Sequence, residues 1–129
     1  MPERLLVSSG SPLEPEIGFS RAVRVGGHIA IAGTAPLSAA GSTVSPGDVY
    51  AQTRRCLEII EHAVEAAGGS LQHVTRTRVF LTDIGRWRDA ARAHAEYFGT
   101  IRPASTFVQV VAFISPDWLV EIEADAVIP

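Results

Sequence analysis

The sequence has one cysteine, no long apolar run and no cluster of basic residues. Cys56 alone cannot form a disulfide within the chain, which favours a reducing compartment. No segment approaches the roughly 20 apolar residues that span a bilayer. Residues 1–10 lack a basic region followed by an apolar core, so we expect no signal peptide. A net charge of −3 disfavours nucleic-acid binding. These absences predict a cytoplasmic protein with neither a nucleic-acid nor a membrane partner.

Signatures of metal binding and of serine catalysis are also missing. The four histidines are scattered along the chain without a pair at metal-ligand spacing, so we predict no metal site. The order of serine, histidine and aspartate residues supports no catalytic triad. Cys56 falls within a helical apolar stripe, where a small core residue is expected rather than a nucleophile.

A length of 129 residues predicts a single compact domain over residues 1–129, with an ordinary 47% of hydrophobic residues. A short edge strand is expected at residues 4–7, followed by a surface loop at residues 11–18. Two β-rich runs at residues 19–25 and 28–32 flank Gly26-Gly27, which is typical of a hairpin.

Two helices are expected. In the first, Ser45 would be the N-cap, Pro46 the first helical residue, and Asp48 the acid of a near capping box. Its apolar residues recur at helical spacing up to Gly68-Gly69, and the stripe needs a sheet to cover. The second helix is expected at about residues 86–98, capped by Asp83 or Gly85.

Strands are expected at residues 74–81 and twice within residues 101–127, where two strands joined by a turn are predicted. The fold class is therefore α+β, with a mixed sheet of about six strands and two helices on one face. The opposite face would carry charged and aromatic residues, and we expect another subunit to cover it. The residues expected there are Arg24, Arg76, Arg78, Phe80, Glu121, Glu123 and Asp125.

Several motifs, taken in order, resemble those of the Rid family of reactive-intermediate deaminases, also called YjgF/YER057c/UK114 or endoribonuclease L-PSP. They are G-F-S-R-A-V-R-V-G-G from Gly18, I-A-G-T from Ile31, D-V-Y-A-Q-T-R-R-C-L from Asp48, A-A-G-G-S-L-Q-H-V from Ala66, T-R-V-F-L-T-D-I from Thr77, R-P-A-S-T-F-V-Q-V from Arg102 and V-E-I-E-A-D-A from Val120.

The resemblance implies a chorismate-mutase-like fold and a homotrimer with three clefts between subunits. It also implies hydrolysis of enamine or imine intermediates, such as 2-aminoacrylate, to a keto acid and ammonia. No cofactor is implied, because an imine is already electrophilic.

The chain departs from the family pattern at positions that bear on the chemistry. Active members carry a carboxylate-binding arginine directly after Pro-Ala, whereas this chain has Ser105 there. The family's aromatic hydroxyl falls on Phe19, which has no hydroxyl. Gly33 and Thr34 stand in the segment where many members have Ser-Gly-Gln. The cleft glutamate is retained as Glu121.

Glu121 is the residue for which we predict a catalytic role, because a desolvated carboxyl can position water or move a proton. The alternative is an ion pair with Arg78. The substrate anion would be bound by Arg78 or by Arg102, which precedes a proline and should be extended. Ser105 and Thr106 would assist, and Phe19, Gly33 and Thr34 would complete the site.

Structural roles remain open for both arginines. Arg78 is equally compatible with an ion-pair network with the acids of the last strand, and Arg102 with a surface position. The function is then either C=N hydrolysis or non-catalytic binding of small carboxylate metabolites by a regulatory trimer. Ribonuclease activity, suggested by the family's older name, is disfavoured by the acidic net charge.

Overall fold

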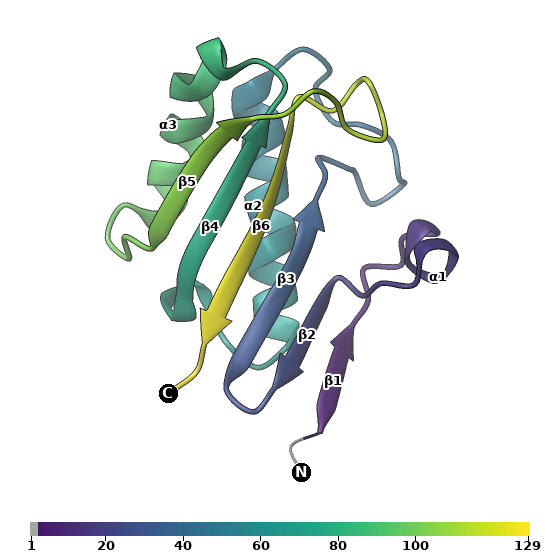
Figure 1. Cartoon of the computed structure of the whole chain (residues 1–129), viewed down its shortest axis with the longest axis vertical. Helices are drawn as coiled ribbons and strands as arrows, with labels where there is room; N and C mark the ends of the chain where they lie inside the picture. Colours follow the sequence, from purple (N-terminus) through teal and green to yellow (C-terminus); the bar gives the residue numbers. More distant parts are fainter. Residues whose placement is uncertain (1–2) are drawn as a thin grey trace.

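The structure is a computed structural model that describes residues 3–129; residues 1 and 2, the start of the N-terminal segment considered above, lie outside them. The elements follow the expected order of three strands, helix, strand, helix and two strands, with an additional short α-helix and two short 3₁₀ helices (Figure 1). They are β1 (Arg4–Val7), α1 (Leu13–Ile17), β2 (Ala22–Val25), β3 (His28–Thr34), α2 (Val49–Ala66), η1 (Leu71–His73), β4 (Val74–Leu81), η2 (Ile84–Arg86), α3 (Trp87–Phe98), β5 (Ala104–Gln109) and β6 (Val120–Val127).

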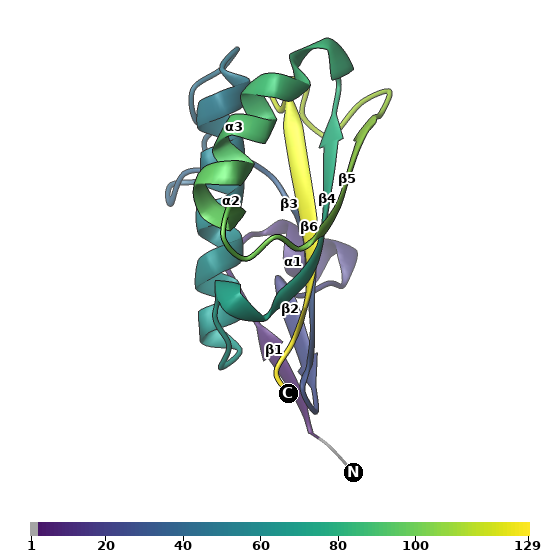
Figure 2. The same cartoon turned by 90° about the vertical axis from the view of Figure 1, so that its left-hand side faces the viewer.

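One mixed sheet of six strands has the order β1-β2-β3-β6-β4-β5. Only the β4–β5 pair is parallel, and the other neighbours are antiparallel. Helices α2 and α3 lie together on one side of the sheet, whereas α1 lies beyond the end of β1 and β2 (Figures 1 and 2). The predicted α+β layering is confirmed. Among residues 3–129, no helix has the length and apolar character needed to cross a membrane.

The core lies between α2 and the centre of the sheet. Cys56, Leu57 and Ile60 are fully buried, as the helical stripe predicted. They pack in one cluster with alternate residues of β3, β6 and β4, because successive strand residues point to opposite faces. Burying each large aliphatic side chain contributes about 1.5–3 kcal/mol, so this layer holds α2 against the sheet. The sheet members of the cluster include Ile29, Ile31, Val79, Leu81, Val120, Ile122 and Ala124.

The beginning of α2 differs from the prediction. The N-cap is Asp48 rather than Ser45, and its carboxylate accepts a hydrogen bond from the Ala51 backbone N–H at 3.0 Å. Ser45 and Gly47 both have positive φ, at 40° and 85°, so the chain is still turning through these residues. Because helical backbone requires negative φ, the helix begins only after this turn.

Arg24 lies on the helix-covered side of the sheet, so its predicted position on the opposite face is wrong. It shares a face with Ala22, which is buried under the helices. The guanidinium reaches past the end of α2, where Nη1 donates to the Ala67 carbonyl at 2.8 Å and Nε donates to the Gly26 carbonyl. This contact satisfies a carbonyl that the end of the helix leaves free.

The pairing of strand β4 with β6 is regular from Arg76 to Leu81, and Arg76 lies opposite Asp125. An irregularity between Val74 and Arg76 in the pairing with β6 turns Val74 into the core. Before α3, Asp83 accepts from the Gly85 N–H in the short helix η2. Trp87 is 41% exposed, whereas Trp118 is buried at 6%.

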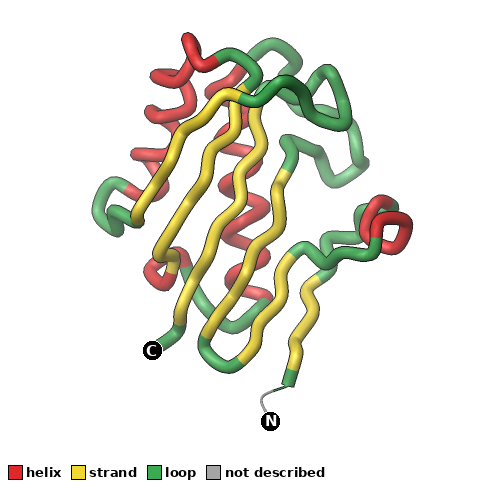
Figure 3. The backbone as a smooth tube through the Cα atoms, in the orientation of Figure 1, coloured by secondary structure: helices red, strands yellow, loops and turns green. Residues whose placement is uncertain are grey.

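The last quarter of the chain contains two strands that do not pair with each other. β5 is an edge strand beside β4, β6 lies between β3 and β4, and residues 110–119 cross between them. This loop and the loop after β3 lie at the same end of the sheet (Figure 3). On the helix-free face, Arg78 contacts Glu123 and Asp125 at 3.3 and 3.4 Å.

The segment expected to be a surface loop contains α1. Glu14, in its first turn, is 7% exposed, and its carboxylate accepts from the backbone N–H and hydroxyl of Ser9 and from the Ser11 N–H. Although burial raises the pKa of Glu14, the hydrogen bonds from Ser9 lower it, and the net pKa is below its ordinary value. The ionised Glu14 carboxylate therefore holds Ser9 and Ser11 in place, and these two residues line the cavity described below.

Candidate functional site

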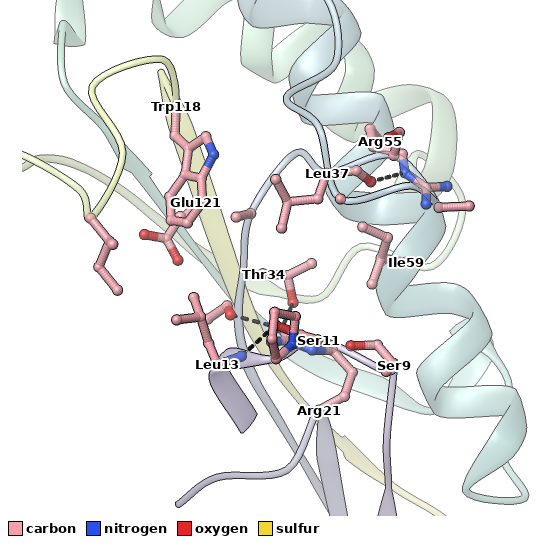
Figure 4. Close-up of a pocket in the computed structure, with 18 of the residues that line it drawn as sticks. Ser9, Ser11, Leu13, Arg21, Thr34, Leu37, Arg55, Ile59, Trp118 and Glu121 are labelled. Atoms are coloured by element: carbon pink, nitrogen blue, oxygen red, sulfur yellow. Dashed lines mark hydrogen bonds between the residues drawn. The ribbon is translucent and has the colours of Figure 1, made fainter. Parts of the chain in front are cut away.

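A cavity of about 550 Å³ opens where β3 extends beyond β2. The register places the first residue of β2, Ala22, opposite Ile31, whereas β3 continues to Thr34. The N-terminal segment, the loops after β3 and before β6, and α2 enclose this end of the sheet. Figure 4 shows Trp118 and Glu121 on one side, Leu37 and Ile59 on the other, and Arg21 beside Ser11.

Glu121 enters the cavity from β6. A glycine faces it: a Cβ on Gly33 would lie 3.3 Å from Glu121 Oε1, so the absence of a side chain leaves room for the carboxyl. Burial raises the pKa of Glu121, the Arg21 guanidinium opposes this rise, and Glu123 adds to it. Glu121 therefore holds a proton more readily than an ordinary glutamate, which suits a group that transfers protons.

Arg21 is a cavity residue that the sequence analysis missed. It is 7% exposed, and Nη1 donates to the Gly33 carbonyl at 2.7 Å and to Thr34 Oγ1 at 2.8 Å. The arginine thus satisfies polar atoms at the end of β3 that β2 does not reach. The Phe19 ring covers the guanidinium, with Cζ 5.4 Å from the ring centroid. Burial lowers the pKa of Arg21, and the acids Glu14 and Glu121 oppose this.

Two of the residues that line this cavity each have a buried nitrogen atom without a hydrogen-bond partner within residues 3–129. These atoms are Arg21 Nε and Trp118 Nε1. A buried donor without an acceptor costs about 1–3 kcal/mol, and such groups are rare in folded proteins. Both donors would be satisfied by a molecule that brings oxygen acceptors into the cavity.

Gln52 of α2, also missed from the sequence, holds two walls of the cavity together. Its side chain is fully buried. Nε2 donates to the carbonyls of Val44 and Asp117 at 3.2 and 3.0 Å, and Oε1 accepts from the Leu119 N–H at 2.9 Å. The loop after β3 and the loop before β6 are therefore fixed through one side chain, and Trp118 lies between two of its contacts.

Four of the predicted site residues, Glu121, Phe19, Gly33 and Thr34, lie together in this cavity. Thr34 is 1% exposed, and its hydroxyl accepts from Arg21 while donating to the Ala32 carbonyl at 2.8 Å. Its hydroxyl is therefore occupied in positioning Arg21. The proximity of these residues matches the expectation, whereas their predicted roles toward a substrate stay predictions.

The other four predicted site residues do not line this cavity within one chain. Arg78 is opposite Thr106 in the β4–β5 register, on the helix-free face. Ser105 points to the opposite side, where its Oγ accepts from Thr77 Oγ1 at 2.8 Å. Arg102 has a φ of 58°, so its predicted extended conformation is wrong.

The conformation of Arg102 follows from the end of α3. Its backbone N–H donates to the Phe98 carbonyl at 2.8 Å, and this turn requires the left-handed backbone. The preference of a residue before proline for extended backbone is overridden by that contact. Anion binding by any of these four residues stays a prediction. It requires a second copy of the chain that brings the residue to this cavity.

Within the described residues, no group of three or more His, Cys, Asp or Glu side chains is placed to hold a metal ion. His94 is instead partly buried against aromatic rings, and its Nε2 shares a 2.8 Å hydrogen bond with Thr77 Oγ1. Burial lowers the pKa of His94, which keeps the imidazole neutral.

Comparison with known proteins gives consistent results over nearly the whole chain. The family model described as endoribonuclease L-PSP matches residues 9–128. The 3-aminoacrylate deaminase RutC of Acinetobacter baylyi is 36% identical over 126 residues, which are 98% of each chain.

Solved structures agree. Rv2704 of Mycobacterium tuberculosis, described as a member of the highly conserved YjgF/YER057c/UK114 family, matches with a TM-score of 0.89 and 48% identity, over 98% of this chain and 100% of that one. YyfA of Yersinia pestis, a Rid family protein of unknown function, matches with a TM-score of 0.86 and 29% identity, over 98% of this chain and 100% of that one.

Proposed function

Because the chain belongs to the endoribonuclease L-PSP family, also called YjgF/YER057c/UK114 or Rid, we propose that it hydrolyses reactive enamine and imine intermediates to a keto acid and ammonia. The reaction takes place in the cavity that contains Glu121. The observation that carries this proposal is a partly desolvated carboxyl with a raised pKa beside a cavity of small-metabolite size. A relative named for deamination of 3-aminoacrylate supports the reaction class.

Glu121 moves the protons of this reaction. An enamine first becomes an imine when protonated Glu121 donates to its terminal carbon. The carboxylate then takes a proton from water as the water oxygen bonds to the carbon of C=N. Glu121 returns that proton to nitrogen. The Glu121 carboxylate then takes the proton of the new hydroxyl group as the C–N bond breaks, so that ammonia and the carbonyl product leave and protonated Glu121 is restored. The raised pKa of Glu121 favours its protonated form relative to an ordinary glutamate, which assists the first step, donation of a proton to the enamine carbon.

We further propose that three copies assemble, with the helix-free face of the sheet in the interface. That face exposes apolar side chains such as Leu6 of β1 at 58% and Val108 of β5 at 40%, and it also carries the charged groups of β4 and β6. In such an assembly Arg78, Arg102 or Thr106 of a neighbouring copy would approach the cavity. Light scattering should give three times the 13.8 kDa of one chain. A mass of one chain would contradict this part of the proposal.

The reaction is tested by generating 2-aminoacrylate enzymatically from serine and following its decay by absorbance. The protein should accelerate the decay in proportion to its concentration, and Glu121→Gln should lose about 10²–10⁴-fold of the acceleration. Arg24→Lys is a matched control, because Arg24 is a backbone-bonded arginine outside the cavity. No acceleration with 2-aminoacrylate, 3-aminoacrylate or an amino-acid-derived imine would refute the hydrolase proposal.

Ser105 at the position after Pro103-Ala104 favours a second candidate, non-catalytic binding of carboxylate metabolites. The arginine expected there for substrate binding is absent, and the Ser105 hydroxyl is bonded to Thr77. This candidate predicts saturable binding of keto acids together with an unaccelerated imine decay. The hydrolase predicts both binding and acceleration.

A further inference from the structure

The guanidinium of Arg21 is fixed by one of its nitrogen atoms. The side-chain hydrogen bonds that it makes within residues 3–129 all come from Nη1, which donates to Gly33 O at 2.7 Å, to Thr34 Oγ1 at 2.8 Å and to Ala32 O at 3.5 Å. The group is planar, so these contacts at the end of β3 fix the direction of its opposite edge. That edge, formed by Nε and Nη2, is the one whose two N–H groups match a carboxylate.

This edge has an unsatisfied donor. Nε is buried and has no hydrogen-bond partner within the described chain, and Arg21 as a whole is only 7% exposed. Two acids lie near enough to act on Arg21 electrostatically, Glu14 and Glu121. Glu14 is already occupied by Ser9 and Ser11. Within residues 3–129, neither acid accepts a hydrogen bond from the Nε–Nη2 edge of the guanidinium, so this edge has no hydrogen-bond partner.

A second donor in the same cavity is also unsatisfied. Trp118 Nε1 is buried without a partner in residues 3–129, and the residue is 6% exposed. It comes from the loop before β6, whereas Arg21 comes from the segment before β2, so two distant segments each bring a free donor to one cavity. Buried donors are rarely left unpaired, and a shared oxygen-rich ligand accounts for both.

We propose that Arg21 is the anion-binding residue of this cavity, and that its Nε–Nη2 edge donates two hydrogen bonds to the carboxylate of the substrate. The ligand class is a small 2-oxo or 2-imino carboxylate, with a further oxygen or nitrogen atom within reach of Trp118 Nε1. A single chain then supplies both the guanidinium and Glu121. This inference deepens the proposed function and rests on it for the identity of the site.

The test measures equilibrium binding of pyruvate, a stable 2-oxo carboxylate, with pyruvamide as its neutral counterpart. The chain has two tryptophans, and Trp87 is exposed, so Trp87→Phe leaves Trp118 as a fluorescence reporter inside the cavity. In this background Arg21→Lys keeps the charge but loses the two-pronged edge. Arg24→Lys makes the same change at an arginine outside the cavity.

Pyruvate should quench or shift Trp118 emission saturably, whereas pyruvamide should bind at least about tenfold more weakly. Arg21→Lys should weaken pyruvate binding by about ten- to a hundredfold, the range for a charge-assisted hydrogen bond, and Arg24→Lys should leave it unchanged. Equal affinity of the Arg21→Lys variant and its parent would overturn the proposal. So would failure of pyruvate to bind the parent at tens of millimolar.

A measurement on the unsubstituted protein covers the case in which Arg21→Lys does not fold. The Arg21 Nε–Hε proton resonance, assigned through its own side chain, should move downfield as pyruvate is added and remain in place with pyruvamide. An unmoved resonance at saturating pyruvate overturns the proposal. The proposed hydrolysis fails separately: Arg21-dependent pyruvate binding without accelerated imine decay refutes only the reaction. Accelerated decay with an unchanged Michaelis constant in Arg21→Lys refutes only the role of Arg21.

Discussion

Replacing Gln52 with methionine tests whether one buried amide fixes the loops around the cavity. Methionine has a similar length and volume, so the change removes hydrogen bonds with little loss of packing. The three shortest contacts that disappear are those to Val44 O, Asp117 O and Leu119 N, and a longer one to Ser45 O at 3.5 Å is lost with them. At about 1 kcal/mol each, Gln52→Met should reduce the free energy of unfolding by about 3 kcal/mol.

The assay is urea unfolding at one fixed protein concentration, because assembly would make stability depend on concentration. With a slope of about 2 kcal/mol/M, the midpoint should fall by roughly 1.5 M. Trp118 emission in the Trp87→Phe background should also shift to the red, since the loop carrying Trp118 is released.

The control is Gln109→Met, which removes a single exposed contact from the Ile84 N–H and should cost less than about 1 kcal/mol. Equal midpoints for the two glutamine variants, with unchanged Trp118 emission, would refute the idea that Gln52 holds these loops.

Three further predictions follow from burial. Burial raises the pKa of Glu121 above its ordinary value of 4.5, so ionising it costs folding free energy: its stabilising neutral form is lost as pH rises through the folded pKa. Glu121→Gln should therefore gain stability over the parent at alkaline pH and show no gain below about pH 4.5, and a pH-independent difference in urea midpoints would contradict this. Burial likewise raises the pKa of Cys56, so a thiol reagent should label it only in denaturant, and rapid native labelling would refute its core position. Ile60→Ala should cost about 2–5 kcal/mol in urea unfolding, whereas Ile114→Ala, at a site 72% exposed, should change the midpoint little.

The parts of the fold that local periodicity determines were predictable from the sequence. The helical spacing of apolar residues around Leu57 and Ile60 correctly predicts α2, and the alternation from Val120 to Val127 correctly predicts β6. The N-cap was misplaced because Ser45 and Pro46 form a plausible helix start on their own. The turn through Ser45 and Gly47, which both have positive φ, places the N-cap at Asp48 instead, so that α2 begins at Val49.

Arg24 illustrates a different limit. Strand alternation places Arg24 on the same face as Ala22, but it does not say which face the helices cover. The hydrogen-bond partner of Arg24 on that face, the Ala67 carbonyl, is 43 residues away in the sequence. The burial of Val74 likewise depends on an irregularity in the pairing with β6. Which side of the sheet each of these two residues occupies is therefore decided by nonlocal contacts.

The candidate site was predictable in part for the same reason. The position of Glu121 followed from alternation and from a resemblance to a known family. Arg21 was missed because its sequence position, just before β2, looks like an exposed strand entry. Its burial depends on β3 continuing past the end of β2, which leaves carbonyls that only a nearby long donor reaches. Sequence spacing carries no signal of that difference in strand length.

The central claim is that Glu121 catalyses C=N hydrolysis in this cavity, and one measurement tests it most directly. The decay of 2-aminoacrylate, generated from serine, is compared with the parent protein, with Glu121→Gln and without protein. We predict that the decay rate rises linearly with the concentration of the parent protein. The acceleration produced by the same concentration of Glu121→Gln should be about 10²–10⁴-fold smaller. Equal decay rates for the parent protein and Glu121→Gln would contradict the account.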